Sequence, residues 1–260
     1  VAFYTLGCKL NFSETSTIAR DFVKHGFEKV KFDCAADFYV INTCSVTENA
    51  DKEAKKLIRK AKRISPYSKI AVIGCFAQLQ PNSIAEINGV DVVLGAKDKF
   101  DLLKYLSETN IATPTKVIRS GIDEVNSFKP SFSMEERTRA YLKVQDGCDY
   151  TCSFCTIPLA RGQSRSGTIS STIKAAKEIV KFGNKEIVLT GVNIGDFGKK
   201  NNESFIDLIY ELDRVSQINR IRISSIEPNL LTDEIIEFCN SSKKFMPHFH
   251  IPLQSGSDKI

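Results

Sequence analysis

Short apolar runs alternate with longer amphipathic stretches along most of this chain, and the alternation limits the folds that it can adopt. In the first half, apolar runs of strand length are separated by stretches with helical periodicity. The runs lie at residues 2–6, 38–41, 69–73 and 90–95, and the helical patterns at 11–26, 51–64 and 98–107. Strands that alternate with helices favour a parallel sheet covered by helices on both faces. We therefore predict an open parallel α/β sheet in an N-terminal domain at residues 1–108.

Three cysteines occupy equivalent positions in this half. Cys8, Cys44 and Cys75 each lie just past the end of an expected strand. Ligands gather at the carboxyl edge of an open parallel sheet. One such cysteine alone would most often be a small buried side chain, but three equivalent ones predict a shared site. We interpret them as ligands of an iron–sulfur cluster with one iron left open.

Three more cysteines form a tighter group. Cys148, Cys152 and Cys155 have the spacing Cys-x-x-x-Cys-x-x-Cys. A [4Fe–4S] cluster is normally bound by four thiolates, so three leave one iron open, as in catalytic metal sites. Zinc is the alternative, because Cys-x-x-Cys is its usual half-site. The nearest histidine, His248, lies far along the chain, which favours a cluster.

This spacing, with Phe154 before the last cysteine, resembles the signature of radical S-adenosylmethionine (SAM) enzymes. The resemblance implies that SAM chelates the open iron and is cleaved to methionine and a 5′-deoxyadenosyl radical. The protein binds and orients the cofactor and excludes water. It also implies SAM contacts from polar or glycine-rich strand ends, although such residues are also common loop formers. The residues concerned are Phe154, Gly191, Asn193, Glu227 and Gln254.

From about residue 139 the alternation resumes. Strands are expected at 141–144, 186–189, 220–223 and 248–253, and helices at 169–182, 205–215 and 232–242. The resemblance implies a partial radical-SAM βα barrel at 139–260. The family's further βα units and its small RNA-binding β domain are absent, so we expect a fragment. Residues 109–138, with Pro114, Gly121 and Pro130, read as a linker in which 115–118 can add a strand.

Four segments together narrow the resemblance to a family. Gly-Cys-Lys-Leu-Asn at residues 7–11, Asn-Thr-Cys at 42–44, Gly-Cys at 74–75 and the later cysteine group resemble the methylthiotransferases. Lys9 after Cys8 is similar to the branch that acts on N6-threonylcarbamoyladenosine in tRNA. The isopentenyladenosine branch more often has Gln there, and the branch that modifies a ribosomal-protein aspartate has Pro-Lys.

The family resemblance also implies the cofactors and partners. Two [4Fe–4S] clusters and SAM are expected: the cluster at Cys148, Cys152 and Cys155 generates the radical, which abstracts hydrogen from carbon-2 of the adenine. The cluster at Cys8, Cys44 and Cys75 presents the sulfur, and SAM also supplies the methyl group. The implied partners are tRNA and an electron donor such as a flavodoxin or ferredoxin. An iron–sulfur or zinc-binding module without catalysis is the non-enzyme alternative, which SAM binding would distinguish.

Composition agrees with this interpretation. The net charge of +5 permits an anionic partner such as RNA. Eight cysteines without a signal peptide or a membrane-length apolar run predict a reducing, cytoplasmic location with no membrane. The helix at 51–64 combines an apolar face with seven Lys or Arg side chains, either a phosphate-binding face or a solvated one. Arg161 and Arg165 are candidates to meet SAM or the anticodon loop. We assign Cys34 and Cys239 structural roles, and no histidine a catalytic one.

Overall fold

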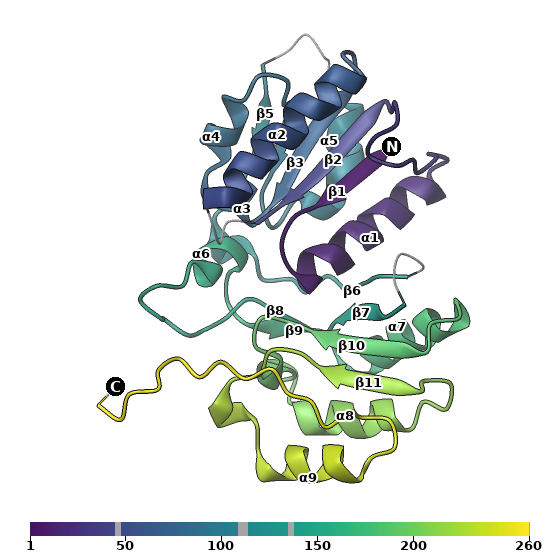
Figure 1. The fold of residues 1–260 in the computed structure, drawn as a ribbon, viewed down its shortest axis with the longest axis vertical. Coiled ribbons are helices and arrows are strands. Elements are labelled where there is room, and N and C mark those ends of the chain that lie inside the picture. The colour runs from purple at the N-terminus through teal and green to yellow at the C-terminus, as the bar shows by residue number, and fades with distance from the viewer. Residues whose placement is uncertain (45–47, 109–113, 135–137, 260) are drawn as a thin grey trace. The chain divides into compact units, whose positions relative to one another are not determined.

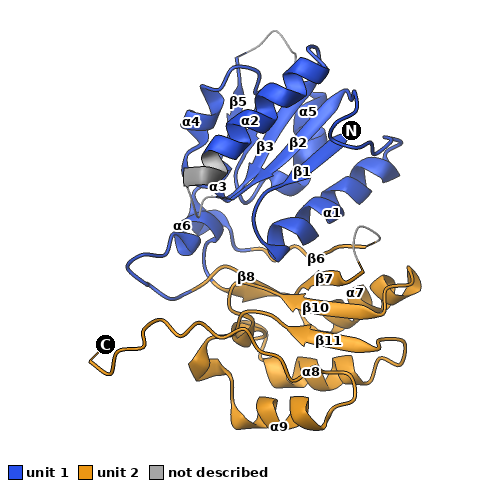
Figure 2. Ribbon diagram, in the orientation of Figure 1, with its two compact units in different colours: residues 1–126, 149–163 blue, residues 127–148, 164–260 orange. Residues whose placement is uncertain are grey.

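The computed structural model describes residues 1–44, 48–108, 114–134 and 138–259. The chain forms two compact units, each of which is assembled from two stretches of sequence (Figure 2). Unit 1 comprises Val1–Asn126 and Asp149–Gln163, and unit 2 comprises Ser127–Cys148 and Ser164–Ile260. The segment 149–163 therefore folds with the N-terminal unit, although it lies within the expected barrel.

Unit 1 contains the parallel sheet that the sequence predicts (Figure 1). Its five strands follow the order β1-β2-β3-β4-β5, and every neighbouring pair is parallel. They are β1 (Ala2–Thr5), β2 (Phe38–Thr43), β3 (Lys69–Gly74), β4 (Val92–Leu94) and β5 (Lys116–Ile118). An isolated parallel bridge joins Ala2 to Val30 on the other side of β1. The chain therefore passes from β1 to Val30 on one side of β1, and then to β2 on the other side of β1. The direction in which successive strands are added to the sheet thus reverses at β1.

Helices cover both faces of this sheet because its strands are apolar on both sides. One core joins Ile18 and Phe22 of α1 (Lys9–Lys24) to Val40 of β2 and to α5 (Leu102–Ser107). A second core joins α2 (Glu48–Ile64) to Tyr39 and Ile41, the neighbours of Val40 in the strand. Alternate residues of a strand face opposite sides, so β2 contributes to both cores. The short helices α3 (Cys75–Leu79) and α4 (Pro81–Ala85) connect β3 to β4, and α6 (Ile157–Arg161) packs on α3.

Unit 2 has a four-stranded sheet of order β11-β10-β7-β6. Strands β7 (Ala140–Lys143), β10 (Glu186–Thr190) and β11 (Arg220–Ile223) are parallel, whereas β6 (Ser131–Phe132) is antiparallel to β7. Helices α7 (Ile169–Lys181), α8 (Phe205–Asp213) and α9 (Asp233–Ser241) share one large apolar core with the sheet. A short antiparallel pair, β8 (Gln145–Asp146) and β9 (Arg165–Ser166), flanks the segment 147–164. The predicted α/β class, with a parallel sheet followed by βα units, is confirmed.

Several local expectations differ from the structure. Helix α1 begins at Lys9, two residues before the expected start at residue 11, with Cys8 as its N-cap, and the Asn11 side chain donates to two strand ends. The predicted strand at 248–253 is wrong: in that range the described residues make a single bridge, from His250 to Ser225. Pro247 and Pro252 flank it, and proline cannot donate to a strand ladder. The expected linker also supplies β5 and β6. Among the described residues, no helix has both the length and the apolar character needed to span a membrane.

Candidate functional site

Cys8, Cys44 and Cys75, here called the edge triad, lie at one edge of the unit 1 sheet. Cys8 follows β1 and caps α1, Cys44 follows β2, and Cys75 is the first residue of α3 directly after β3. The three strands are adjacent and parallel, so their carboxyl ends share this edge. Cys8 and Cys44 flank the point where the strand order reverses, which is where open α/β sheets bind ligands.

Two glycines bring the backbone close to this edge. Gly7 has φ of +101°, and a Cβ on it would lie 2.7 Å from Cys44 Cβ and 3.0 Å from Cys44 Sγ. Gly74 has φ of +102°, and a Cβ there would lie 2.3 Å from the Thr43 carbonyl oxygen. Only glycine fits both the left-handed conformation and the close approach. The Gly-Cys pairs at residues 7–8 and 74–75 therefore have a steric cause.

The thiols of the edge triad differ in their surroundings. Cys8 is exposed, Cys44 is intermediate and Cys75 is buried. Burial raises the pKa of the Cys75 thiol, while the positive charges of Arg161 and Lys99 lower it and Cys8 and Glu14 raise it. Cys75 therefore lies beside a group of buried charges.

The donor chemistry of this edge fits an iron–sulfur cluster. Soft thiolates are the ligands that such clusters and zinc prefer. Among the residues that the structure describes, no three His, Cys, Asp or Glu side chains are gathered as for a single metal ion. Thiols that bind different irons of one cubane stand farther apart than the ligands of one ion.

Cys148, Cys152 and Cys155, here called the loop triad, lie in a turn that begins in unit 2 and continues in unit 1. Cys152 is exposed and the other two are intermediate. The Cys155 amide donates to the Cys152 carbonyl (3.0 Å), which closes the turn. The boundary between the units follows Cys148, so Cys152 and Cys155 belong to unit 1. Phe154 is 77% exposed, a large fraction for an aromatic side chain.

A buried carboxylate holds the start of this turn within unit 2. Asp146 Oδ2 accepts from Lys143 Nζ (3.0 Å) and from Arg165 Nη2 (3.2 Å), and its Oδ1 accepts from the amide of Gly147 (2.9 Å). All three ionised side chains are buried. Buried charges are stable only when paired and hydrogen-bonded, so this group fixes the backbone just before Cys148. The sequence offered Arg165 as a candidate for contact with SAM or RNA. In the structure its side chain is buried and donates to Asp146 instead.

The expected SAM contacts Gly191, Asn193 and Glu227 lie after β10 and β11, at the carboxyl ends of parallel strands. A Cβ on Gly191 would lie 2.8 Å from Gln145 Oε1. The same oxygen accepts from the amides of Val192 and Asn193, both at 2.9 Å. The Gln145 side chain therefore holds the backbone that follows β10 through these two hydrogen bonds. No pattern in the sequence predicted this role.

The polar groups of the other candidates differ in accessibility. Asn193 is buried; its Oδ1 accepts from the Glu227 amide (3.3 Å) and its Nδ2 donates to Asp196 Oδ2 (3.4 Å). Its side chain thus joins the ends of β10 and β11. Glu227 is half-buried, and Gln254 is exposed with a left-handed φ of 63°. Asn193 is therefore suited to shaping this edge, while Glu227 and Gln254 have accessible side chains.

Comparison with known proteins agrees with the two-part architecture. Residues 1–95 match the family described as "Uncharacterized protein family UPF0004", and residues 142–260 match the "Radical SAM superfamily". Among solved structures, a radical SAM methyltransferase, TsrM from Kitasatospora setae, has a TM-score of 0.66 at 12% identity over 99% of this chain and 60% of that one. Such low identity supports the fold alone. The match of residues 142–260, which include the loop triad, places this part of the chain in the class of radical SAM proteins.

Curated relatives narrow the class further. The chain is 44% identical to a protein of Bacillus subtilis named "Threonylcarbamoyladenosine tRNA methylthiotransferase MtaB", over 100% of this chain and 58% of that protein. A protein of the same name from Thermotoga maritima is 37% identical, over 100% and 59%. A "tRNA-2-methylthio-N(6)-dimethylallyladenosine synthase" of Ruegeria is 31% identical, over 98% and 60%. Over its whole length the chain is thus similar to radical SAM methylthiotransferases, and it spans less than two thirds of the length of these relatives.

Proposed function

We propose that this chain is part of a transferase that adds a methylthio group to carbon-2 of N6-threonylcarbamoyladenosine in tRNA. The observation that carries the proposal is the presence of two separate cysteine triads, one at the edge of a parallel sheet and one in the turn before α6. Methylthiolation needs both a radical to remove a hydrogen and a source of sulfur. The names of the relatives at 37–44% identity support the substrate.

In this proposal each triad binds one [4Fe–4S] cluster. The loop triad would hold one cluster together with SAM, which would supply the radical chemistry, and the edge triad would hold the second cluster, which would supply the sulfur. The protein's own contribution is orientation. Asp146 holds the start of the loop, and Gln145 holds the end of β10, where Gly191 allows the close approach of the Gln145 side chain. An electron donor such as a flavodoxin or ferredoxin completes the reaction.

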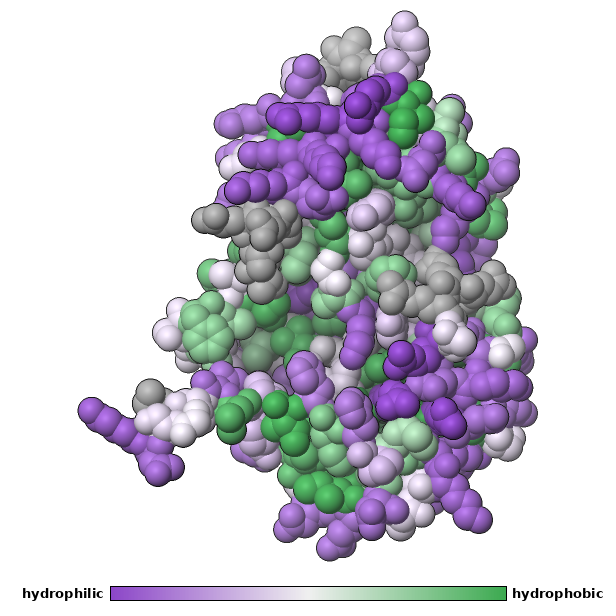
Figure 3. All heavy atoms as spheres, viewed as in Figure 1, coloured by the Kyte–Doolittle hydropathy of each residue, from purple (hydrophilic) through white to green (hydrophobic). Residues whose placement is uncertain are grey.

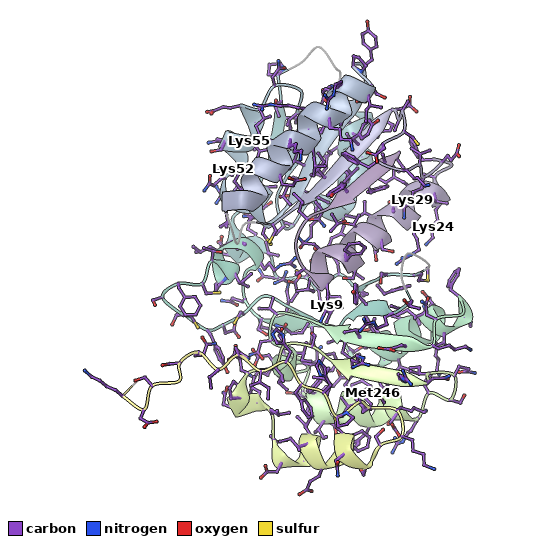
Figure 4. All side chains as sticks on the ribbon, in the orientation of Figure 1. Lys9, Lys24, Lys29, Lys52, Lys55 and Met246 are labelled. Atoms are coloured by element: carbon purple, nitrogen blue, oxygen red, sulfur yellow. The ribbon has the colours of Figure 1, made fainter. Side chains whose placement is uncertain are left out.

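A second substrate has specific support as well. Relatives named as dimethylallyladenosine synthases match at 30–31% identity. The position that distinguishes the branches is Lys9, which is exposed in the first turn of α1 beside Cys8 (Figure 4). Its ammonium group is thus available to a negatively charged substrate. The threonyl carboxylate of N6-threonylcarbamoyladenosine carries such a charge, whereas an isopentenyl group does not, which favours the first substrate.

A basic surface on α2 is suited to the phosphates of tRNA. The helix buries Ala54, Leu57, Ile58 and Ala61, as its pattern predicts. Its exposed cations, here called the basic face, are Lys52, Lys55, Lys56, Arg59 and Arg63. Hydrophilic side chains cover this part of unit 1, and Lys52 and Lys55 project from the helix (Figures 3 and 4). Lys60 instead pairs with Asp33, and Lys62 with Asp91. We propose that the basic face contacts the RNA backbone, a contact that does not depend on base sequence.

Mass spectrometry of tRNA nucleosides tests the proposal. Cells that lack the full-length protein should lose the 2-methylthio derivative of N6-threonylcarbamoyladenosine and accumulate its precursor. The wild-type gene should restore the product, and a variant with the edge triad changed to alanine should not. Loss of only the isopentenyladenosine derivative would support the second substrate. Unchanged levels of both nucleosides would contradict a role in tRNA modification. The remaining candidate functions would then be methylthiolation of a protein and cluster binding without catalysis.

A further inference from the structure

A fully buried carboxylate in α1 joins three distant segments of unit 1. Glu14 Oε2 accepts from Lys99 Nζ (2.6 Å), and the Glu14 oxygens also accept from the guanidinium of Arg161 at 3.3 and 3.4 Å. The side chains of Glu14, Lys99 and Arg161 are 0%, 5% and 3% exposed. They come from α1, from the 3₁₀ turn before α5 (Lys99–Asp101) and from the end of α6. Removing any one would leave a buried charge with fewer partners, which is strongly unfavourable.

Arg161 also reaches the strand ends of the edge triad. Its Nη2 donates to Asn11 Oδ1 at 2.5 Å. The Asn11 amide group in turn donates to the carbonyl oxygens of Leu6 (3.0 Å) and Thr43 (3.1 Å). Leu6 is two residues before Cys8, and Thr43 directly precedes Cys44. A continuous path of hydrogen bonds therefore connects the backbone beside two of the edge cysteines to Arg161.

On its other side, Arg161 connects to two of the loop cysteines. It is the last residue of α6, which begins two residues after Cys155. The Ala160 amide donates to Thr156 (3.0 Å), so the helix continues directly from the Cys152–Cys155 turn. Helix α6 packs against α3, whose first residue is Cys75. All of these contacts lie within unit 1.

We propose that Arg161 is a positioning residue that holds the Cys152–Cys155 turn at a fixed separation from the edge triad. Asn11, Glu14, Lys99 and Arg161, here called the positioning network, set that separation. The inference rests on the proposed function, in which both triads bind clusters that act on one adenine base. Two reacting groups that serve one base must be placed to within about 1 Å. A guanidinium can contact Asn11 and Glu14 at once in fixed geometry, whereas lysine supplies only a mobile point charge.

Hydrogen–deuterium exchange on the anaerobically reconstituted full-length protein tests this directly. In Arg161→Met and Arg161→Lys, amides of residues 152–163 should exchange at least about tenfold faster, because α6 loses its attachment, while α7 stays unchanged. Lys99→Met and Lys97→Met form a matched pair. Lys99 binds buried Glu14, whereas Lys97 pairs with Glu124 at the exposed surface, so only Lys99→Met should loosen the network.

The same variants are assayed for both products. Each should bind wild-type amounts of iron, because all six cysteines are retained, and the amount of 5′-deoxyadenosine formed is measured alongside as the reference for radical formation. The methylthiolated nucleoside formed per 5′-deoxyadenosine should fall by at least about tenfold, because misplacement affects the sulfur transfer alone. Arg161→Lys should not restore this ratio, and Lys97→Met should match wild type.

Each outcome bears on the proposal. Unchanged exchange at 152–163 in both Arg161 variants would overturn it, and so would faster exchange with an unchanged product ratio. Full restoration by Arg161→Lys would show that charge alone suffices and would also overturn it. If Arg161→Met does not fold, Arg161→Lys, which keeps a positive charge opposite Glu14, still decides the question. Failure of the proposed function is seen earlier, in wild-type protein that binds one cluster or forms no methylthiolated nucleoside, and it would overturn this inference as well.

Discussion

Replacing Gly74 with alanine is expected to damage the edge triad selectively. The first cost is the backbone conformation at φ of +102° and ψ of −166°, a region used almost only by glycine, which disfavours an L-residue by about 1–3 kcal/mol. The second is steric. The new Cβ would lie 2.3 Å from the Thr43 carbonyl oxygen and 2.4 Å from Asn42 Oδ1, so one side must move by about 1 Å to reach an ordinary contact. Both neighbours are buried in β2, and the overlap should cost a further ~1–3 kcal/mol.

Gly26 provides a matched control in the same unit. It has φ of +88°, but a Cβ there would meet nothing within 4 Å. Gly26→Ala should therefore carry only the conformational cost of about 1–2 kcal/mol. Comparison of the two variants therefore contrasts a positive φ in open space with a positive φ combined with overlap at the strand ends that precede Cys44 and Cys75.

Two measurements on the full-length protein decide the outcome. Urea-dependent exchange of the β3 amides in apo protein reports the stability of unit 1, where Gly74→Ala should be the less stable variant. Anaerobic reconstitution should load about four irons per chain in Gly74→Ala, because the edge triad is displaced, against about eight in Gly26→Ala. Equal stability of the two variants together with full iron loading in Gly74→Ala would refute the steric reasoning.

Four further predictions follow from the site and the surface. Changing the loop triad to alanine should reduce the iron content from about eight to about four per chain; stoichiometric zinc with little iron would contradict it. Changing the edge triad to alanine should preserve SAM cleavage by full-length protein but abolish the methylthiolated product, and loss of cleavage in a folded variant would disprove this division of roles. Glutamate at Lys55, Lys56, Arg59 and Arg63 should weaken tRNA binding and reduce its logarithmic salt dependence by up to about 3; an unchanged salt titration would make the basic face a solvated surface only. Iodoacetamide at pH 8 should modify exposed Cys34 and spare Cys239, because burial, with Asp213 nearby, raises the pKa of Cys239 to about 11; rapid alkylation of Cys239 in native protein would contradict this.

The arrangement of the edge triad was predictable because it depends on local patterns. Apolar runs mark β1, β2 and β3, and each cysteine follows one of them within three residues. Parallel pairing then brings these positions to one edge without further information. The loop triad is contained in a single turn, so its spacing is visible in the sequence alone. The apolar face of α2 follows from helical periodicity in the same way.

Other features depend on contacts between distant segments. The hydrogen bond from Arg161 to Asn11 joins residues 150 positions apart, and nothing near either residue indicates its partner. The sequence therefore left Arg161 and Arg165 as candidates for ligand contact, whereas folding buries both against carboxylates. The role of Asn11 was hidden for the same reason: its amide donates to strand ends that come close only in the tertiary structure.

The sequence by itself thus determined which residues have the chemistry for clusters and which ends of strands present them. Apolar periodicity and short-range spacing are properties of neighbouring residues, so they can be recognised in the sequence when the fold is unknown. Only the tertiary structure decided which unit the segment 149–163 joins and which charges become buried. A buried carboxylate such as Glu14 is stable only where folding supplies cations, and Lys99 and Arg161 meet it because three segments distant in sequence pack together.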